Sequence, residues 1–140
     1  MLYAHPILML CLVALTFYVL RLGAVRFAAV HLGRKGVFAW KRHVFLGRLA
    51  MAGLAAGMCG GLFMTWYFWS TPGSTGTHFH VALAMMALVA SGAATGWSLD
   101  RVRKPKNPLA LLHAAGNVLL ALLALVQMYT GYGVLKDFLW

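Results

Sequence analysis

Acidic residues are nearly absent from this sequence: in 140 residues, two aspartates face twelve lysines and arginines. Charged residues of both signs make up 10% of the chain, against roughly 25% in a typical soluble domain. Hydrophobic residues make up 62%. This composition excludes an ordinary soluble domain and indicates an integral membrane protein. It also argues against coupled proton pumping, because Asp100 and Asp137 both lie outside the apolar runs.

Cysteine is scarce as well. Cys11 and Cys59 fall inside apolar runs, lack the spacing of a metal site, and are expected to be small packing residues. The motif C-x-x-C-H does not occur, which argues against covalently attached c-type haem. A net charge of +10 does not indicate a nucleic-acid partner here, because the basic residues lie between apolar runs and not along one exposed face.

Four apolar runs, each long enough to cross a membrane as a helix, dominate the chain. The predicted helices cover roughly residues 4–25, 43–69, 78–99 and 109–135. Asn107-Pro108 looks like an N-cap followed by proline at the first helical position. The first run lacks a positive n-region and a cleavage site, so we expect a retained helix and not a signal peptide. We therefore predict an all-α, integral membrane four-helix bundle, with residues 1–140 forming one transmembrane domain.

The basic residues are unevenly distributed over the links between these helices. The first link and its borders contain Arg21, Arg26, Arg34, Lys35, Lys41, Arg42 and Arg48. The third link contains Arg101, Arg103, Lys104 and Lys106, the second link ("STPGSTGT") contains none, and the tail contains Lys136. The positive-inside rule places both basic links in the cytoplasm and both termini on the opposite side, as in a multi-pass protein of a bacterial inner membrane. An aromatic belt is expected on that outer side, from residues 65–69 together with Tyr129, Tyr132 and Trp140.

Five histidines lie at the ends of the predicted helices. On the predicted topology, His5, His78 and His80 are on the outer side, and His43 and His113 are on the inner side. Each level is served by two alternate helices, which lie diagonally across the core of a four-helix bundle. Two imidazoles facing each other in this way can bind one flat macrocycle from both sides, which suits b-type haem. Zinc fits less well, because each level offers few histidines and no acid or cysteine.

Other interpretations of these residues remain open. Histidines near membrane interfaces can simply meet water and lipid headgroups, and His31 in the first link has no matching partner. His78 and His80 point to nearly opposite faces of a helix, so both cannot bind one iron. We favour His78 as the ligand, which leaves His80 for a propionate or a quinone carbonyl. Arg48, about one turn past His43, is expected to neutralise a propionate of the inner haem.

Glycines form stripes in two of the helices. Gly53, Gly57 and Gly61 recur every four residues, and so do Gly92 and Gly96. Small residues at this spacing let helices approach closely. A porphyrin plane would equally need bare backbone beside it, and both interpretations can hold together.

An ordered set of short segments resembles the four-helix core of the cytochrome b561-like di-haem membrane proteins, especially a small bacterial group of that kind. The matching segments are "HPILML", "WKRHVFLGRLA", "TGTH", "SGAATGWSLDR" and "LLHAAGNVLL", and together they span nearly the whole chain. The resemblance implies His5 with His78 on an outer haem and His43 with His113 on an inner one. It also implies electron exchange with ascorbate, quinols, superoxide or partner redox proteins.

Together these observations predict a transmembrane electron-transfer cytochrome with two non-covalent, bis-histidine b haems (iron). It would act as an electron carrier or as a membrane subunit of an oxidoreductase, exchanging electrons with a quinone pool or a partner redox protein. On the outer side His80, Tyr67 and Tyr132 could accept protons. The alternative is a non-redox assembly factor or structural subunit that packs partner helices. A small transporter fits less well, because the runs lack broken helices and central ionisable groups.

Overall fold

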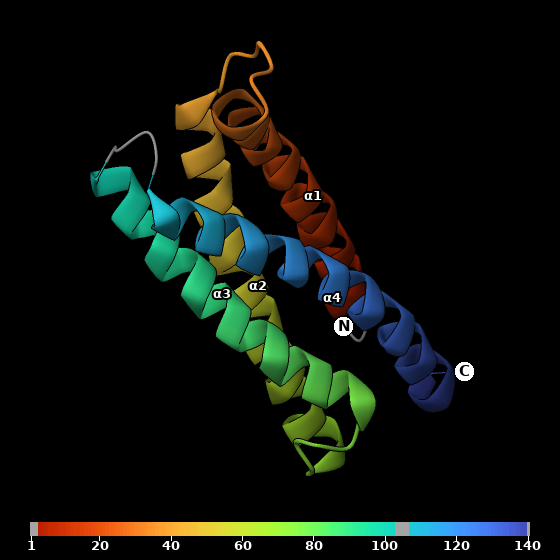
Figure 1. The fold of residues 1–140 in the computed structure, drawn as a ribbon. Helices are drawn as coiled ribbons and strands as arrows, with labels where there is room; N and C mark the ends of the chain where they lie inside the picture. Colours follow the sequence, from red (N-terminus) through yellow and green to blue (C-terminus); the bar gives the residue numbers. More distant parts are fainter. Residues whose placement is uncertain (1–2, 103–106, 140) are drawn as a thin grey trace.

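The computed structural model describes residues 3–102 and 107–139, and it contains four α-helices joined by short links (Figure 1). Helix α1 covers Ala4–His31, α2 covers Trp40–Trp69, α3 covers Thr77–Arg101 and α4 covers Pro108–Leu139. No strand occurs in these residues. All four helices are long and apolar enough to cross a membrane. The predicted all-α architecture, with four helices able to cross a membrane, is therefore confirmed, although every helix extends beyond its expected bounds.

Specific hydrogen bonds define where α1 ends and where α4 begins. Helix α1 continues through a basic segment and stops where Gly33 takes a φ of +63° and the Arg34 N–H donates to the Ala28 carbonyl at 3.2 Å. Glycine adopts this positive φ without steric cost, and the chain turns away from the helix axis there. Helix α4 starts as predicted, because the Asn107 side-chain oxygen accepts the Leu109 N–H at 3.0 Å.

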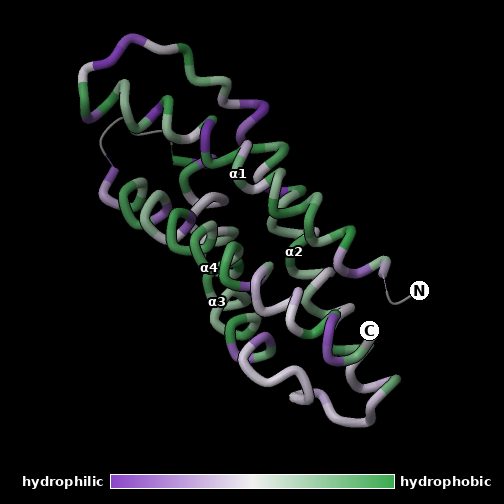
Figure 2. The backbone as a smooth tube through the Cα atoms, turned by 90° about the vertical axis from the view of Figure 1, so that its right-hand side faces the viewer, coloured by the Kyte–Doolittle hydropathy of each residue, from purple (hydrophilic) through white to green (hydrophobic). Residues whose placement is uncertain are grey.

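The four helices form a closed ring. The helices packed side by side are α1 with α2, α2 with α3, α3 with α4, and α4 with α1. Helix α1 therefore lies diagonally opposite α3, and α2 lies diagonally opposite α4 (Figures 1 and 2). This is the arrangement on which the expected histidine pairs depend.

The centre of the ring is an apolar core to which every helix contributes. Leu54 of α2, Met85 of α3 and Leu120 of α4 are almost completely buried. The rest of the buried cluster is formed by Leu12, Val13, Met58, Val89 and Ala124. Hydrophobic residues occur along the length of all four helices (Figure 2). Because large side chains such as Leu112 and Leu122 are more than half exposed, the outer surface suits contact with lipid tails.

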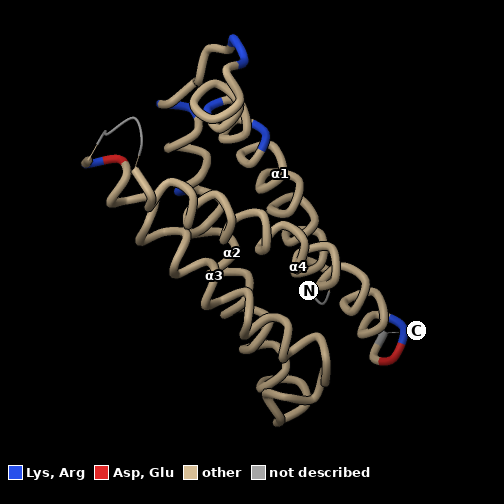
Figure 3. The backbone as a smooth tube through the Cα atoms, viewed as in Figure 1, with Lys and Arg blue, Asp and Glu red and all other residues tan. Residues whose placement is uncertain are grey.

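The two ends of the bundle differ in charge (Figure 3). Lysines and arginines gather at the end formed by the α1–α2 link and the C-terminus of α3, which we call the basic end. The two chain termini lie at the opposite end, here called the terminal end, where the charged residues are Lys136 and Asp137. Arg103, Lys104, Lys106 and Trp140, on which part of the topology and the aromatic belt were predicted, lie outside the described residues.

Candidate functional site

The basic end brings together two histidines from diagonally opposite helices. The imidazole centres of His43 in α2 and His113 in α4 lie 6.4 Å apart, and the ring planes are 78° from each other. A bond from imidazole nitrogen to a transition metal is about 2 Å long. Two imidazoles on opposite sides of one metal ion therefore have ring centres separated by about 6 Å. The observed spacing matches that arrangement, and the two rings also have the geometry of an edge-to-face pair.

The terminal end holds the second expected pair. His5 of α1 and His78 of α3 are both half-buried at this end. His80 is exposed, and its Nδ1 lies 2.9 Å from the Gly76 carbonyl one turn back along the chain. His31 is also exposed, with its ring against Phe27. The structure therefore directs His78, and not His80, toward the bundle interior.

In the α1–α2 hairpin each histidine packs against a glycine of the other helix. A Cβ atom added to Gly61 would lie 2.9 Å from Cε1 of His5, and one added to Gly23 would lie 3.2 Å from Cε1 of His43. The first distance is too short for a real contact and the second is tight. Glycine is the residue that leaves room for these rings.

The α3–α4 hairpin repeats this arrangement. A Cβ atom on Gly131 would lie 3.0 Å from Cε1 of His78, and one on Gly96 would lie 3.2 Å from Cε1 of His113. Every helix therefore supplies one histidine to one end of the bundle and one glycine to the other end. The two hairpins have the same design.

This design has a signal in the sequence, a fixed spacing between histidine and glycine, that the sequence-based predictions did not use. In every helix the glycine follows the histidine by 18 residues: His5 and Gly23, His43 and Gly61, His78 and Gly96, His113 and Gly131. Eighteen residues make five full turns, or about 27 Å of rise, so the two residues share one face at opposite ends of the helix. Gly61 and Gly96 were expected to assist packing or to leave room for a porphyrin, whereas Gly23 and Gly131 were missed.

Hydrogen bonds at Nδ1 orient the imidazoles. His43 Nδ1 lies 3.2 Å from the Val19 carbonyl oxygen, which can only accept, so Nδ1 carries the proton. His5 likewise interacts with the backbone of Gly57. Val19 and Gly57 each precede the packing glycine of their helix by one turn. In His43 the lone pair is therefore on Nε2, the form in which a histidine binds metal while its other nitrogen is anchored.

In the second hairpin threonine hydroxyls lie beside Nδ1 in addition to the backbone of Gly92, for His113, and of Gln127, for His78. Thr95 Oγ1 lies 2.9 Å from His113 Nδ1, and Thr130 Oγ1 lies 3.1 Å from His78 Nδ1. Each threonine immediately precedes the glycine against which the same ring packs. These threonines were not singled out from the sequence, although the repeated Thr-Gly dipeptide is visible there.

Two side-chain amides complete the surroundings of the α3–α4 histidines, and neither was expected from the sequence. The Asn117 amide nitrogen donates to the His113 carbonyl at 2.7 Å and lies 3.3 Å from Nδ1 of the same ring. The Gln127 amide nitrogen lies 3.2 Å from Nε2 of His78, and the Gln127 Oε1 atom is buried without a hydrogen-bond partner. Binding of a metal by His78 therefore requires the Gln127 side chain to turn away.

Arg48, expected to face a haem propionate, points to a carboxylate in this structure. Its guanidinium donates to Asp100 at 2.7 Å, across the α2–α3 contact at the basic end. The same guanidinium lies 5.0 Å from the Trp97 ring, as does that of Arg101. The Arg48 side chain is 56% exposed, whereas that of Asp100 is 18% exposed. Arg48 is thus part of an interhelix ion pair.

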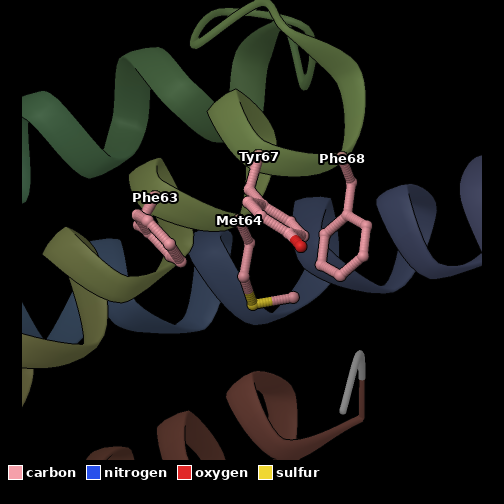
Figure 4. A pocket seen from close by; sticks show the side chains of 4 residues that line it. All are labelled: Phe63, Met64, Tyr67 and Phe68. Atoms are coloured by element: carbon pink, nitrogen blue, oxygen red, sulfur yellow. The ribbon is translucent and has the colours of Figure 1, made fainter.

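A pocket of about 260 Å³ opens beside α2 at the terminal end (Figure 4). It is lined by Phe63, Met64, Tyr67 and Phe68. It starts within one turn of Gly61, the glycine against which His5 packs. Near the ends of α2 and α4 the rings of Trp69 and Phe138 are in contact. This aromatic surface lies where the interfacial belt was expected.

The donor set fits haem better than a bare metal ion. Within residues 3–102 and 107–139 no group of three or more His, Cys, Asp or Glu side chains could hold a metal ion, and zinc takes at least three protein ligands. A porphyrin supplies four nitrogens itself, so two histidines complete its coordination. The glycines against each ring provide the space that such ligands need. No protein-family model, curated protein or solved structure matches this chain.

Proposed function

We propose that this chain is a b-type membrane cytochrome that carries electrons between two haems, one at each end of the bundle. His43 and His113 would bind the haem at the basic end, and His5 and His78 the haem at the terminal end. The observation that carries the proposal is the 6.4 Å separation of the His43 and His113 rings across the bundle diagonal. The resemblance to cytochrome b561-like proteins supports the same pairing.

Haem iron with two histidine ligands has no open position, so it exchanges single electrons and does not bind oxygen. The chain's own residues would supply binding, orientation and insulation. The glycines make room for the imidazoles, the Nδ1 partners fix their orientation, and the buried cluster around Leu54, Met85 and Leu120 keeps water out between the two levels. Two haems held in this way would connect the two faces of the membrane.

The charge distribution supports an orientation with the basic end in the cytoplasm of a bacterium and both termini outside, because positive residues are retained on the cytoplasmic side. The electron partner would be a quinone or a redox protein. The aromatic pocket at the terminal end supports a quinone, because its apolar walls suit a ring and Tyr67 offers a hydroxyl. Surrounding lipid would contact the exposed apolar side chains.

The direct test is the absorption spectrum of the purified protein in detergent, oxidised and then reduced with dithionite, with a pyridine haemochrome assay to count haem. Sharp reduced α and β bands and two haems per chain are the expected result. One haem per chain would contradict one of the two levels. A colourless protein from haem-replete cells would overturn the proposal.

A second function, that of a non-redox membrane subunit, is favoured by one observation. Both ring nitrogens of His78 have protein partners, Thr130 at Nδ1 and Gln127 at Nε2, so this histidine is satisfied without a ligand. Under this alternative the protein purifies colourless, and His78→Ala or Gln127→Ala lowers its thermal stability by breaking the network. Under the cytochrome proposal His78→Ala instead removes the haem of the terminal end, and Gln127→Ala leaves that haem in place.

A further inference from the structure

The two hairpins differ in the side chains beside Nδ1 of their histidines. All four rings interact with the backbone one turn before the glycine against which they pack. In α3 and α4 the hydroxyls of Thr130 and Thr95 lie beside Nδ1 as well. Each proposed haem would therefore have one ligand held by the backbone alone and one held by the backbone together with a threonine.

At the basic end the direction of the threonine bond follows from counting protons. A threonine hydroxyl has one proton and two lone pairs. Thr95 Oγ1 lies 2.7 Å from the Ser91 carbonyl one turn back, which takes that proton. The 2.9 Å contact with His113 must then be a bond that Nδ1–H donates to Oγ1. The lone pair of His113 is left on Nε2.

The same count applies at the terminal end. Thr130 Oγ1 donates to the Gln127 carbonyl at 3.2 Å, so it accepts the Nδ1–H of His78 at 3.1 Å. In both cases the next residue is the glycine that faces Cε1 of the same ring. The Thr-Gly dipeptide thus positions the imidazole: the threonine hydroxyl accepts from Nδ1, and the glycine leaves space for the adjacent Cε1.

Building on the proposed function, we infer that Thr95 and Thr130 are positioning residues that set the tautomer and the electron-donating strength of His113 and His78. An acceptor at Nδ1 makes the imidazole more basic and so favours the more highly charged ferric iron. Each threonine would lower the reduction potential of the haem at its own end. The tuning is local, because each hydroxyl serves one ring.

The test is a redox titration of the haem-loaded protein and its Thr95→Val and Thr130→Val variants. Valine keeps the shape of threonine and removes the hydroxyl. Thr95→Val should raise the midpoint potential of the basic-end haem alone, and Thr130→Val should raise that of the terminal-end haem alone. Thr95→Ser and Thr130→Ser should restore the original values, because serine retains the oxygen.

Thr16→Val is the matched control. Thr16 is buried in α1, and its hydroxyl makes the same bond to the carbonyl one turn back, Leu12, at 2.9 Å. The Thr16→Val variant should leave the midpoint potentials of both haems unchanged, because the hydrogen bond that it removes lies within α1 and contacts no histidine. Two retained haems with unshifted potentials in both valine variants would overturn the inference while leaving the proposed function intact.

Nitrogen NMR of protein labelled at histidine tests the inference separately from haem chemistry. If the protein is colourless, the proposed function fails, but the tautomers of His78 and His113 can still be read. In the haem-free protein the Nδ1–H form is expected in the wild type, with a shift of His113 toward the Nε2–H form in Thr95→Val. For His78 the shift is expected in Thr130→Val combined with Gln127→Ala, because the Gln127 amide otherwise donates to Nε2. Tautomers that do not respond to loss of the hydroxyl would overturn the positioning role.

Discussion

Gly61 of α2 lies so close to His5 of α1 that a methyl group on its α-carbon would come within 2.9 Å of Cε1 of the imidazole. Three further histidines have an equivalent glycine neighbour, so an α-carbon without a side chain is a recurring requirement at both ends of the bundle. The neighbouring Gly60 faces open space. Adjacent residues of one helix thus offer a controlled comparison.

Gly61→Ala should weaken binding of the terminal-end haem by about tenfold, because the His5 ring must move to accommodate the new methyl group. Gly60→Ala should keep full haem content. Both substitutions remove the conformational freedom of a glycine within a helix, a gain of about 0.5–1 kcal/mol in folding stability that cancels in the comparison. Haem titration of the two variants is the measurement, and equal affinities would show that the contact is unimportant.

His43→Ala should remove the basic-end haem, because one of the two histidines that would hold it is lost. It should keep the terminal-end haem, because the histidines of that pair are on the other two helices. The reduced spectrum should fall to about half its intensity, as measured per chain by pyridine haemochrome. His80→Ala is the control and should keep two haems, because His80 is exposed. Full haem content in His43→Ala would exclude His43 as a ligand.

The ion pair between Arg48 and Asp100 should respond unequally to loss of its two members. Arg48→Leu leaves the more buried carboxylate of Asp100 without its partner, and one oxygen of that carboxylate has no hydrogen bond even in the intact pair. Asp100→Asn leaves a largely exposed cation instead. We expect Arg48→Leu to cost about 1 kcal/mol more unfolding free energy than Asp100→Asn.

Unfolding in detergent, followed by tryptophan fluorescence, measures this difference. Arg101→Leu is the control for lost stacking, because Arg101 lies at the same 5.0 Å from the Trp97 ring as Arg48 does. If Arg48→Leu and Arg101→Leu cost the same, stacking on Trp97 and not the ion pair accounts for the stability.

Leu54→Ala should lower the unfolding free energy by about 2–5 kcal/mol, because Leu54 is fully buried among side chains of the other helices and its loss opens a cavity. Leu62→Ala in the same helix should cost less than about 1 kcal/mol, since Leu62 is 41% exposed and lipid can replace its contacts. Thermal unfolding monitored by circular dichroism compares the two. Equal losses would mean that the apolar cluster is not the centre of the bundle.

Much of the candidate site was accessible from the sequence because it depends on helix periodicity. Each histidine lies near the end of an apolar run, and the runs fix which end of the bundle it occupies. The pairing of His43 with His113 was expected from the diagonal relation of alternate helices, and in the structure their rings lie 6.4 Å apart. What periodicity could not supply was the register between helices, and therefore the partners of each ring.

By itself the sequence determined the four helices, their apolar surfaces and the accumulation of basic residues at one end, because these depend on local composition and on the rise of a helix. Tertiary packing decided the rest. It turned His78 inward and His80 outward, paired Arg48 with Asp100, and brought Thr95 and Thr130 to the Nδ1 atoms of two histidines. These contacts join residues on different helices, and the distance between such residues is set by how the helices cross and not by their positions along the chain.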